Sequence, residues 1–187
     1  MKDSEATRER ILEAATAEFA AYGLAGARVD RIALAASANK NSIYRYFKSK
    51  DNLFGAVLER HLQRVYSEVQ FTPEDLPSFA VRFFDYAMGH PDLVRLMAWY
   101  GLERNREEPE IPPESMSGKL AALAALQNDG LVGPAFTPAF LFTVITALAS
   151  AWTVINPFSG SIDPDATNDL TALRHAIARS VERLSST

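Results

Sequence analysis

Residues 28–59 read RVDRIALAASANKNSIYRYFKSKDNLFGAVLE, and this stretch decides the fold. Its first part keeps apolar residues at helical spacing, at Val29, Ile32, Ala33 and Ala36. Asn39 can cap a second short helix over residues 40–47, because its side-chain oxygen can accept a backbone N–H bond at a helix start. Two short helices joined by a tight turn and packed on an apolar first helix form a helix-turn-helix, which places its second helix in the major groove of DNA.

The helix expected over residues 40–47 carries polar side chains at its front, namely Lys40, Asn41, Ser42, Tyr44 and Arg45. Ile43 and Phe47 lie four residues apart and can anchor its back. Hydrogen-bond donors, a rigid aromatic ring and cations are the groups that reach phosphates and base edges. Lys48 and Lys50 follow, and Lys50 lies where the N–H groups of a helix start could also face a phosphate. The pattern alone leaves open an ordinary helical hairpin with a solvated polar face.

The sequence around this stretch also predicts helices. The first helix carries one apolar face, made by Ile11, Leu12, Ala15, Phe19 and Tyr22, and Gly23 follows as a C′ residue should. A long amphipathic helix is expected over residues 50–70, and helical periods continue to about residue 184. Exposed loops are expected at residues 105–113 and 157–164, which are rich in proline or in glycine and serine. No segment shows strand alternation, so we expect an all-α fold of about nine helices.

Composition and charge restrict the class of protein. The chain has 187 residues, 48% of them hydrophobic and 22% charged, which is ordinary globular usage. It has no Cys and begins MKDSEATRER, too polar for a secretory signal, so we expect a soluble cytoplasmic protein. Residues 1–66 hold 11 basic and 8 acidic side chains (net +3), and residues 67–187 hold 8 and 15 (net −7). This asymmetry predicts that only the N-terminal part meets a polyanion.

Residues 7–64 resemble the N-terminal domain of the tetracycline-repressor (TetR) family of bacterial transcription regulators. The family pattern of a first helix ending in F-x-x-x-G is matched by Phe19 and Gly23, and its D-I-A-like core by residues 30–33. The pattern Y-x-Y-F-x-S/N-K after the turn is matched by residues 44–50. The resemblance implies a DNA-binding domain over residues 1–50, linked through the helix 50–70, and a ligand-binding and dimerisation domain over residues 51–187. It also implies that the DNA-contacting positions are Arg28, Lys40, Asn41, Ser42, Tyr44, Arg45, Tyr46, Lys48 and Lys50.

Three positions depart from the family pattern. Arg28 stands where Ser or Thr usually caps the second helix, so the cap is weaker and a cation is gained. Ser37 stands at the turn position usually held by Gly and has to tolerate the backbone geometry of that turn, including a positive φ. Asn41 replaces a Gly in the second helix of the motif and brings more hydrogen-bonding capacity to the groove. These departures bear on the operator sequence and leave the fold expectation unchanged.

Residues 130–162 contain no charged side chain. Within them Thr143, Thr146, Ser150 and Thr153 draw a small polar stripe along a helix expected over residues 138–156. A membrane span, a fully buried monomer helix and a helix shared with a second subunit are the three interpretations; the prolines at both ends and the stripe disfavour the first. We favour the third, with Leu173 and Ile177 of the last helix completing a homodimer interface.

The C-terminal part is also rich in aromatic residues and Met. Such side chains form plain cores more often than cavities, but ligand pockets are lined in the same way. The expected pocket for a small apolar or aromatic effector contains Phe83, Tyr86, Met97, Tyr100, Phe142 and Trp152. The resulting hypothesis is a dimeric repressor that binds a pseudo-palindromic operator in double-stranded DNA and is released by this effector.

Two other classes of protein remain to be weighed. An enzyme is not expected, because His61, His90 and His175 lie on separate segments and no metalloprotease, nucleophile-elbow or phosphate-loop motif occurs. No metal site or cofactor is expected either. The second alternative is a dimeric helical module that binds a ligand or a protein and has no DNA-binding activity; the basic and aromatic side chains of residues 40–50 argue against it.

Overall fold

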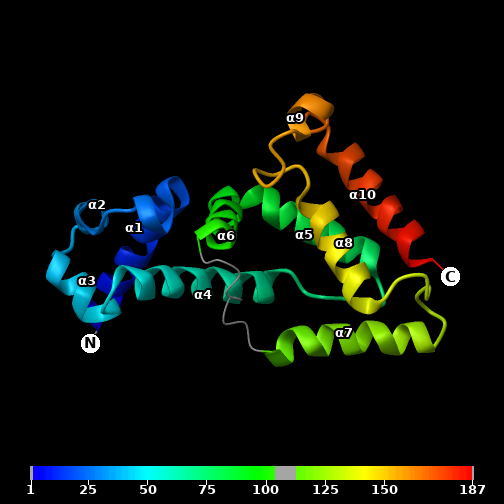
Figure 1. Cartoon of the computed structure of the whole chain (residues 1–187), viewed down its shortest axis with the longest axis horizontal. Coiled ribbons are helices and arrows are strands. Elements are labelled where there is room, and N and C mark those ends of the chain that lie inside the picture. Colours follow the sequence, from blue (N-terminus) through cyan, green and yellow to red (C-terminus); the bar gives the residue numbers. More distant parts are fainter. Residues whose placement is uncertain (1, 104–112, 187) are drawn as a thin grey trace. The chain divides into compact units, whose positions relative to one another are not determined.

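The computed structural model describes residues 2–103 and 113–186, and all regular structure within these ranges is helical, which confirms the all-α prediction. Figure 1 shows the order of the helices along the chain. The helices group into two compact units. The first unit runs to Arg64, past the predicted boundary at residue 50, and takes in a later helix. Apart from Pro113, which begins a helix, the expected loop at 105–113 lies outside the described residues.

The first unit contains α1 (Lys2–Gly26), α2 (Val29–Ala35), α3 (Lys40–Phe47), most of α4 (Lys50–Glu68) and α6 (Pro91–Glu103). Its core is built from the apolar faces that the sequence pattern predicts, except that Tyr22 is 51% exposed, and α6 adds Leu96 to them. The Phe19 and Phe54 rings meet edge to face, 5.0 Å apart between centroids. The fully buried side chains of this core include Ile11, Phe19, Ile32, Ile43, Leu53, Phe54 and Leu96. Buried apolar area of this kind is the main source of stability for short helices.

The turn between α2 and α3 has the geometry that the sequence predicts. Ser37 adopts φ +48°, a left-handed conformation that a non-glycine residue rarely takes. Asn39 caps α3, because its side-chain oxygen accepts the Asn41 backbone N–H at 2.9 Å. Lys48 ends α3 with φ +67° and donates its backbone N–H to the Tyr44 carbonyl at 2.9 Å. The turn and both caps thus fix where α3 begins and ends.

The end of α1 is fastened by α6. Gly23 has φ +69° and interrupts the regular helix at the position where the sequence predicts a C′ glycine. The Leu24 backbone N–H donates to Glu103 Oε2 at 2.6 Å, and that of Ala25 to Glu103 Oε1 at 3.2 Å. The Trp99 indole N–H donates to the Ala20 carbonyl at 3.3 Å. Helix α6 thus supplies acceptors and donors that the end of α1 would otherwise lack.

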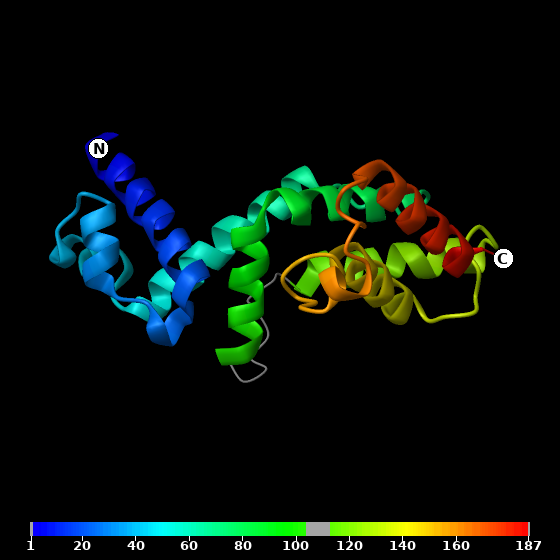
Figure 2. The ribbon, with the colours of Figure 1, turned by 90° about the horizontal axis from the view of Figure 1, so that it is seen from above.

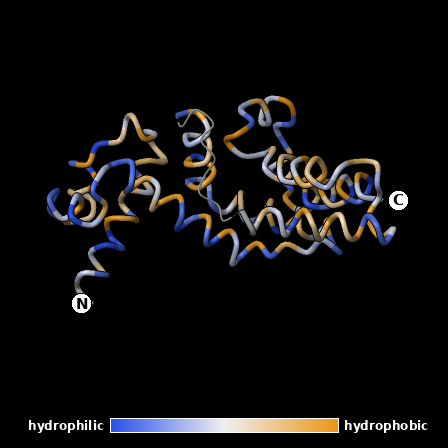
Figure 3. The backbone as a smooth tube through the Cα atoms, turned by 60° about the horizontal axis from the view of Figure 1, so that its bottom comes forward, coloured by the Kyte–Doolittle hydropathy of each residue, from blue (hydrophilic) through white to orange (hydrophobic). Residues whose placement is uncertain are grey.

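The second unit contains the end of α4 with α5 (Leu76–Gly89), α7 (Pro113–Asn128), α8 (Pro138–Ser150), α9 (Ser159–Ile162) and α10 (Leu170–Ser185). Helix α5 packs on α10 and α8, and α7 packs on α8; Figure 2 shows these helices from above. Polar and apolar residues alternate along them, as in amphipathic helices (Figure 3). Its fully buried side chains include Phe84, Leu123, Leu141, Ile145 and Val181.

The C-terminal part departs from the expectation in two places. Helix α8 ends at Ser150 instead of residue 156, and the short helix α9 lies within the expected loop 157–164. The described residues therefore hold ten helices instead of about nine. The Thr153 hydroxyl, which lies beyond the end of α8, donates to the Ser150 carbonyl at 2.7 Å in the turns that follow. In the described part of the chain, none of the helices has the length and apolarity needed to cross a bilayer.

Candidate nucleic-acid interface

Helix α3 presents a polar face away from the core of its own unit. Ile43 and Phe47 are 1% and 6% exposed and anchor the back of the helix as expected. The opposite face carries Lys40, Asn41, Tyr44, Arg45 and Lys48, all of them exposed, while Ser42 is half-buried. A two-turn helix with one buried and one cationic, hydrogen-bonding face has the chemistry needed to enter a major groove.

Lys40 is not a free cation, because its Nζ lies 2.8 Å from Asp30 Oδ1 of α2. A hydrogen bond and the opposite charge of Asp30 raise the pKa of Lys40, and the same contact lowers the pKa of Asp30. A phosphate approaching Lys40 therefore competes with this carboxylate. Both side chains are exposed, so solvent screens the pair and its exchange for a phosphate costs little.

Tyr46 faces the core more than the other predicted DNA-contacting residues. It is half-buried, its ring packs against the core of the first unit, and its hydroxyl lies 2.9 Å from the Ser4 Oγ of α1. The Arg45 guanidinium lies 5.1 Å from the centroid of the Tyr46 ring and donates to the hydroxyl at 3.4 Å. Tyr46 is therefore placed to orient Arg45 and to hold α3 on α1.

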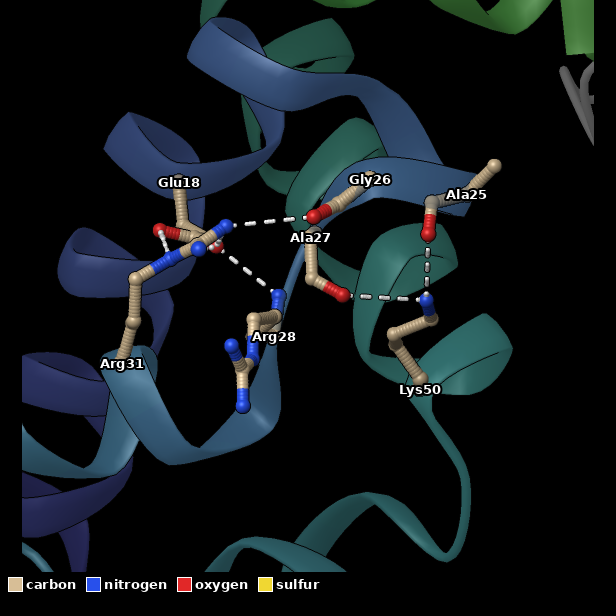
Figure 4. Close-up of polar contacts among 7 residues, drawn as sticks. All are labelled: Glu18, Ala25, Gly26, Ala27, Arg28, Arg31 and Lys50. Carbon is tan, nitrogen blue, oxygen red and sulfur yellow. Dashed lines mark hydrogen bonds and ion pairs between the residues drawn. The ribbon is translucent and has the colours of Figure 1, made fainter.

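Sequence reasoning missed an acid that organises the start of α2. Glu18 of α1 is 9% exposed, and its Oε1 accepts the Arg28 backbone N–H at 2.8 Å and the Arg31 Nε–H at 2.8 Å (Figure 4). The Arg31 Nη2 also donates to the Gly26 carbonyl at 3.1 Å. Arg28 makes no side-chain cap bond at the start of α2; the Glu18 carboxylate of α1 instead accepts the backbone N–H of Arg28 itself.

The charge of Glu18 is stabilised in place. Burial raises the pKa of its carboxyl, but hydrogen bonds from Arg31 and from the Arg28 amide, with the two positive charges, outweigh burial and lower the pKa overall. The only sequence signal was a glutamate one residue before the core residue Phe19, and many exposed glutamates share that pattern.

Lys50 takes part in the same region. Its Nζ donates to the carbonyls of Ala25 and Ala27 at 3.3 and 3.1 Å, so it fastens the start of α4 to the end of α1 (Figure 4). An ammonium has three N–H groups, so one remains for a phosphate. The structure thus adds a structural role to the DNA contact that the resemblance implies.

We expect Lys50→Met to lower the free energy of unfolding by about 1 kcal/mol, because two carbonyls lose their charged donor. It should also reduce the slope of log K against log salt for DNA binding by about 1 per subunit. Urea unfolding and titration of duplex DNA measure the two effects. Lys48→Met is the matched control, because the Lys48 side chain is exposed and its Nζ donates to a single carbonyl, that of Arg45 at 3.3 Å. It should change the salt slope with a smaller loss of stability than Lys50→Met. If Lys50→Met has the same salt slope as the wild type, Lys50 has only a structural role and does not contact a phosphate.

The predicted pocket residues do not all lie together. Phe83, Tyr86, Phe142 and Trp152 pack against the core of the second unit. Met97 and Tyr100 belong to α6 and pack in the first unit, where the Tyr100 ring stacks on Phe54 with centroids 6.3 Å apart. Met97 and Tyr100 thus pack in the core of a different unit from the other four residues, and the pocket itself stays a prediction.

The predicted dimer-interface residues also separate into two groups. Thr143 is exposed and Thr146, Ser150 and Thr153 are half-buried, and each hydroxyl donates to a carbonyl three or four residues earlier. Leu173 and Ile177 are 7% and 1% exposed and lie in the core of their own unit. These two side chains are therefore unavailable to a partner, and the open face of α10 is the adjacent one, made by Ala172, His175, Ala176 and Arg179.

Two of the three histidines make contacts that stabilise the fold. His61 is 9% exposed, and its Nε2 lies 3.2 Å from the Thr16 hydroxyl. The His90 Nδ1 lies 2.8 Å from the Tyr86 carbonyl, and the two rings stack. Within residues 2–103 and 113–186, no three His, Asp or Glu side chains come together in a way that could hold a metal ion.

Two family descriptions match this chain. Residues 11–57 match "Bacterial regulatory proteins, tetR family", and residues 75–183 match "Tetracyclin repressor-like, C-terminal domain". Together they include the helix-turn-helix and most of the second unit. The separate match to the C-terminal part extends the likeness well beyond the DNA-binding motif on which the sequence resemblance rested.

Individual relatives agree with these matches. The chain is 40% identical over 161 residues to the HTH-type transcriptional repressor SCO4008 of Streptomyces coelicolor, covering 83% of this chain and 82% of that protein. It is 32% identical over 111 residues to the HTH-type transcriptional repressor NicS of Pseudomonas putida, covering 55% and 52%. The crystal structure of a transcriptional regulator from Streptomyces coelicolor, SCO4942, superposes with a TM-score of 0.86 at 36% identity, covering 96% of this chain and 98% of that one.

Proposed function

Since the chain belongs to the TetR family of DNA-binding transcriptional regulators, we propose that it is a cytoplasmic repressor that binds a pseudo-palindromic operator as a homodimer and is released by a small molecule. The observation that carries the proposal is the front of α3, where Lys40, Asn41, Tyr44 and Arg45 are exposed over a buried Ile43. Two of the relatives are named repressors, which supports repression over activation.

The operator follows from two-fold symmetry. A homodimer presents two copies of α3, which can dock together only on major-groove faces about 34–36 Å apart or a multiple of that distance. The two half-sites should therefore be inverted repeats. An effector that changes the separation of the two copies of α3 prevents simultaneous docking, and about a 10⁴-fold preference between two states swings the population from 1:99 to 99:1.

For the dimer interface we propose the exposed faces of α8 and α10. Helix α8 exposes Ala139, Phe140, Thr143 and Ala147, with Phe140 at 52%, and α10 packs beside it. The Phe140 ring stacks on Phe136 with centroids 5.1 Å apart and is still half exposed. A half-exposed aromatic ring beside small side chains is typical of a surface that a second subunit buries. The hydroxyls of Thr143, Thr146 and Ser150 already donate to backbone carbonyls of α8, so a partner subunit can cover them without leaving these donors unpaired.

Changing Thr143 to arginine should split the dimer. The side chain is exposed in the middle of the face, so the monomer tolerates the change, whereas a partner would have to bury an unpaired charge. Sedimentation should show half the mass at micromolar concentration, and operator affinity should fall with it. Asp163→Arg, at another exposed position directly after α9, is the control and should stay dimeric. An unchanged mass for Thr143→Arg would place the interface elsewhere.

Arg45→Ala tests the DNA-binding function. If Arg45 reads a guanine, its loss should cost about 1–3 kcal/mol of discrimination between the operator and a random duplex. Lys48→Ala, by contrast, should weaken binding to both duplexes alike. Fluorescence titrations with fragments from around the coding region, repeated over a salt series, measure both effects.

For the wild type, each neutralised phosphate should contribute a slope of about −0.9 in log K against log salt. A flat salt response, or no binding to any fragment, would favour a helical binding module over a regulator. If Arg45→Ala lowers the affinity for both duplexes equally, Arg45 does not read a base and contacts only a phosphate.

A further inference from the structure

Lys119 of α7 lies among three aromatic rings of the second unit. Its Nζ is 4.7 Å from the centroid of the Tyr66 ring at the end of α4, 5.9 Å from that of Phe71 and 5.8 Å from that of Phe142 of α8. An ammonium at such distances from ring faces gains cation–π attraction. We call these four residues the lysine–aromatic cluster. Three of them are drawn from helices far apart in the sequence, and Phe71 from the connection between α4 and α5.

The rings of this cluster are held in place. The Phe71 ring meets Phe142 edge to face with centroids 5.5 Å apart, and both contact the buried ring of Phe79. The connection that carries Phe71 is fixed on either side, because the Arg82 Nη2 donates to the Gln70 carbonyl at 3.1 Å and to the Thr72 hydroxyl at 2.6 Å. A ligand that stacks against Phe71 or Phe142 would therefore meet preorganised rings.

The cation in this cluster has no ion-pair partner among the residues that the structure describes. Lys119 is half-buried, and burial lowers the pKa of its ammonium below the ordinary value. It is the only lysine after Lys50, in a part of the chain with a net charge of −7 over residues 67–187. Arg174 of the same unit, by contrast, meets the Asp85 carboxylate at 2.7 Å.

A partly desolvated ammonium that has no carboxylate partner among the described residues attracts an anion that brings its own apolar surface. The anion restores the lost electrostatic partner, and an attached ring can cover the exposed edges of the flanking aromatic side chains. A cation would have to displace Lys119 from the rings first, and it would lose the ammonium's favourable contact with them. The positive charge of Lys119 therefore favours an anionic ligand over a cationic one.

We propose that the lysine–aromatic cluster binds an aromatic organic anion, such as an aryl carboxylate or sulfonate, with the acid group on Lys119 and the ring against Phe71 and Phe142. The proposal rests on the proposed function, because it gives the chemical class of the effector that releases the operator. It narrows the sequence-based expectation of an apolar or aromatic molecule by adding one negative charge next to the ring.

A pair of fluorescent probes separates the charge from the ring. 8-Anilinonaphthalene-1-sulfonate carries the anion, and N-phenyl-1-naphthylamine has the same ring system without it. We expect Lys119→Met to weaken binding of the sulfonate by about tenfold or more, the loss of one charge-assisted hydrogen bond, and to leave the neutral probe unchanged. Lys119→Arg should restore the sulfonate, and Phe142→Ala should weaken both probes. Arg183→Met removes an exposed cation of the same unit and should change neither.

Two results would overturn the proposal: an equal change in the affinity of both probes for Lys119→Met, or an unchanged affinity for the sulfonate. In the second case, tighter binding of the cationic dye rhodamine 6G to Lys119→Met than to the wild type would indicate a cationic ligand instead. Operator binding is measured on the same preparations without probe. If the protein binds its operator but Lys119→Met affects both probes alike, only the proposed ligand class is wrong. If Lys119→Met weakens the sulfonate selectively but the protein binds no DNA fragment, only the proposed repressor function is wrong.

Discussion

Replacing Glu18 with alanine is expected to lower the free energy of unfolding by about 3 kcal/mol, although Glu18 is not one of the predicted DNA-contacting residues. Its carboxylate is 9% exposed and accepts the Arg28 N–H at the start of α2 and the Arg31 guanidinium. Alanine leaves the Arg28 amide without its acceptor and Arg31 without its ion pair. Since Arg28 has no side-chain cap of its own, the helix-turn-helix should loosen and DNA affinity should fall together with stability.

Urea unfolding monitored by circular dichroism gives the free energy, and operator titration gives the affinity. Glu13→Ala is the matched control, because Glu13 is an exposed glutamate on the same helix and should change stability by no more than about 0.5 kcal/mol. If Glu18→Ala unfolds at the urea concentration of the control, the carboxylate contributes nothing to the start of α2.

The same residue has an expected acid signature. The hydrogen bonds and charges around Glu18 lower its pKa in the folded protein below its unfolded value, so the folded state favours the ionised form. The stabilisation is therefore present above the unfolded pKa of about 4.3 and is lost as pH falls through the lower folded pKa. Glu18→Gln removes this term while keeping one acceptor. The stability difference between wild type and Glu18→Gln should be largest near pH 7 and should shrink below about pH 4.5, whereas a difference that is constant with pH would contradict the assignment.

Local sequence signals were sufficient to predict the helix-turn-helix. Asn39 caps α3, Ser37 takes a positive φ, and Gly23 breaks α1, because each of these features depends on the chemistry of one residue and its immediate neighbours. The end of α8 was harder to predict from the sequence. The uncharged segment keeps its helical spacing of apolar residues past Ser150, so the spacing does not indicate that the helix ends there and that turns containing Thr153 follow.

Contacts between distant segments were beyond the sequence pattern. Lys40 was expected to contact DNA and is also paired with Asp30. Lys50 was expected at a phosphate and also donates to the carbonyls of Ala25 and Ala27. Met97 and Tyr100 have the same apolar period as a pocket-lining helix, but α6 packs on α1 and α4. Leu173 and Ile177 likewise read as an interface stripe and fill their own core. Periodicity gives the buried face of a helix and leaves open which surface covers it.

Gly23→Ala is expected to lower the free energy of unfolding by about 3 kcal/mol or more. Two causes act together at this position. With φ at +69°, an L-residue with a Cβ costs roughly 1–2 kcal/mol. The added Cβ would also lie 2.7 Å from Glu103 Oε1, and 2.8 and 2.9 Å from two carbons of the Trp99 ring, which is overpacking against a rigid indole and costs about 1–3 kcal/mol.

The clash should also separate α6 from the end of α1. Glu103 cannot withdraw without leaving the Leu24 and Ala25 N–H groups unpaired, and Trp99 cannot withdraw without losing its bond to Ala20. Gly55→Ala is the matched control: Gly55 is exposed within α4, a Cβ there meets nothing within 4 Å, and the change should stabilise the helix by up to about 1 kcal/mol. Thermal and urea unfolding of the two variants should therefore move in opposite directions from the wild type. Because the close approach and the positive φ lie in one residue, a Gly23→Ala variant as stable as the wild type would mean that α6 does not hold the end of α1 in this way.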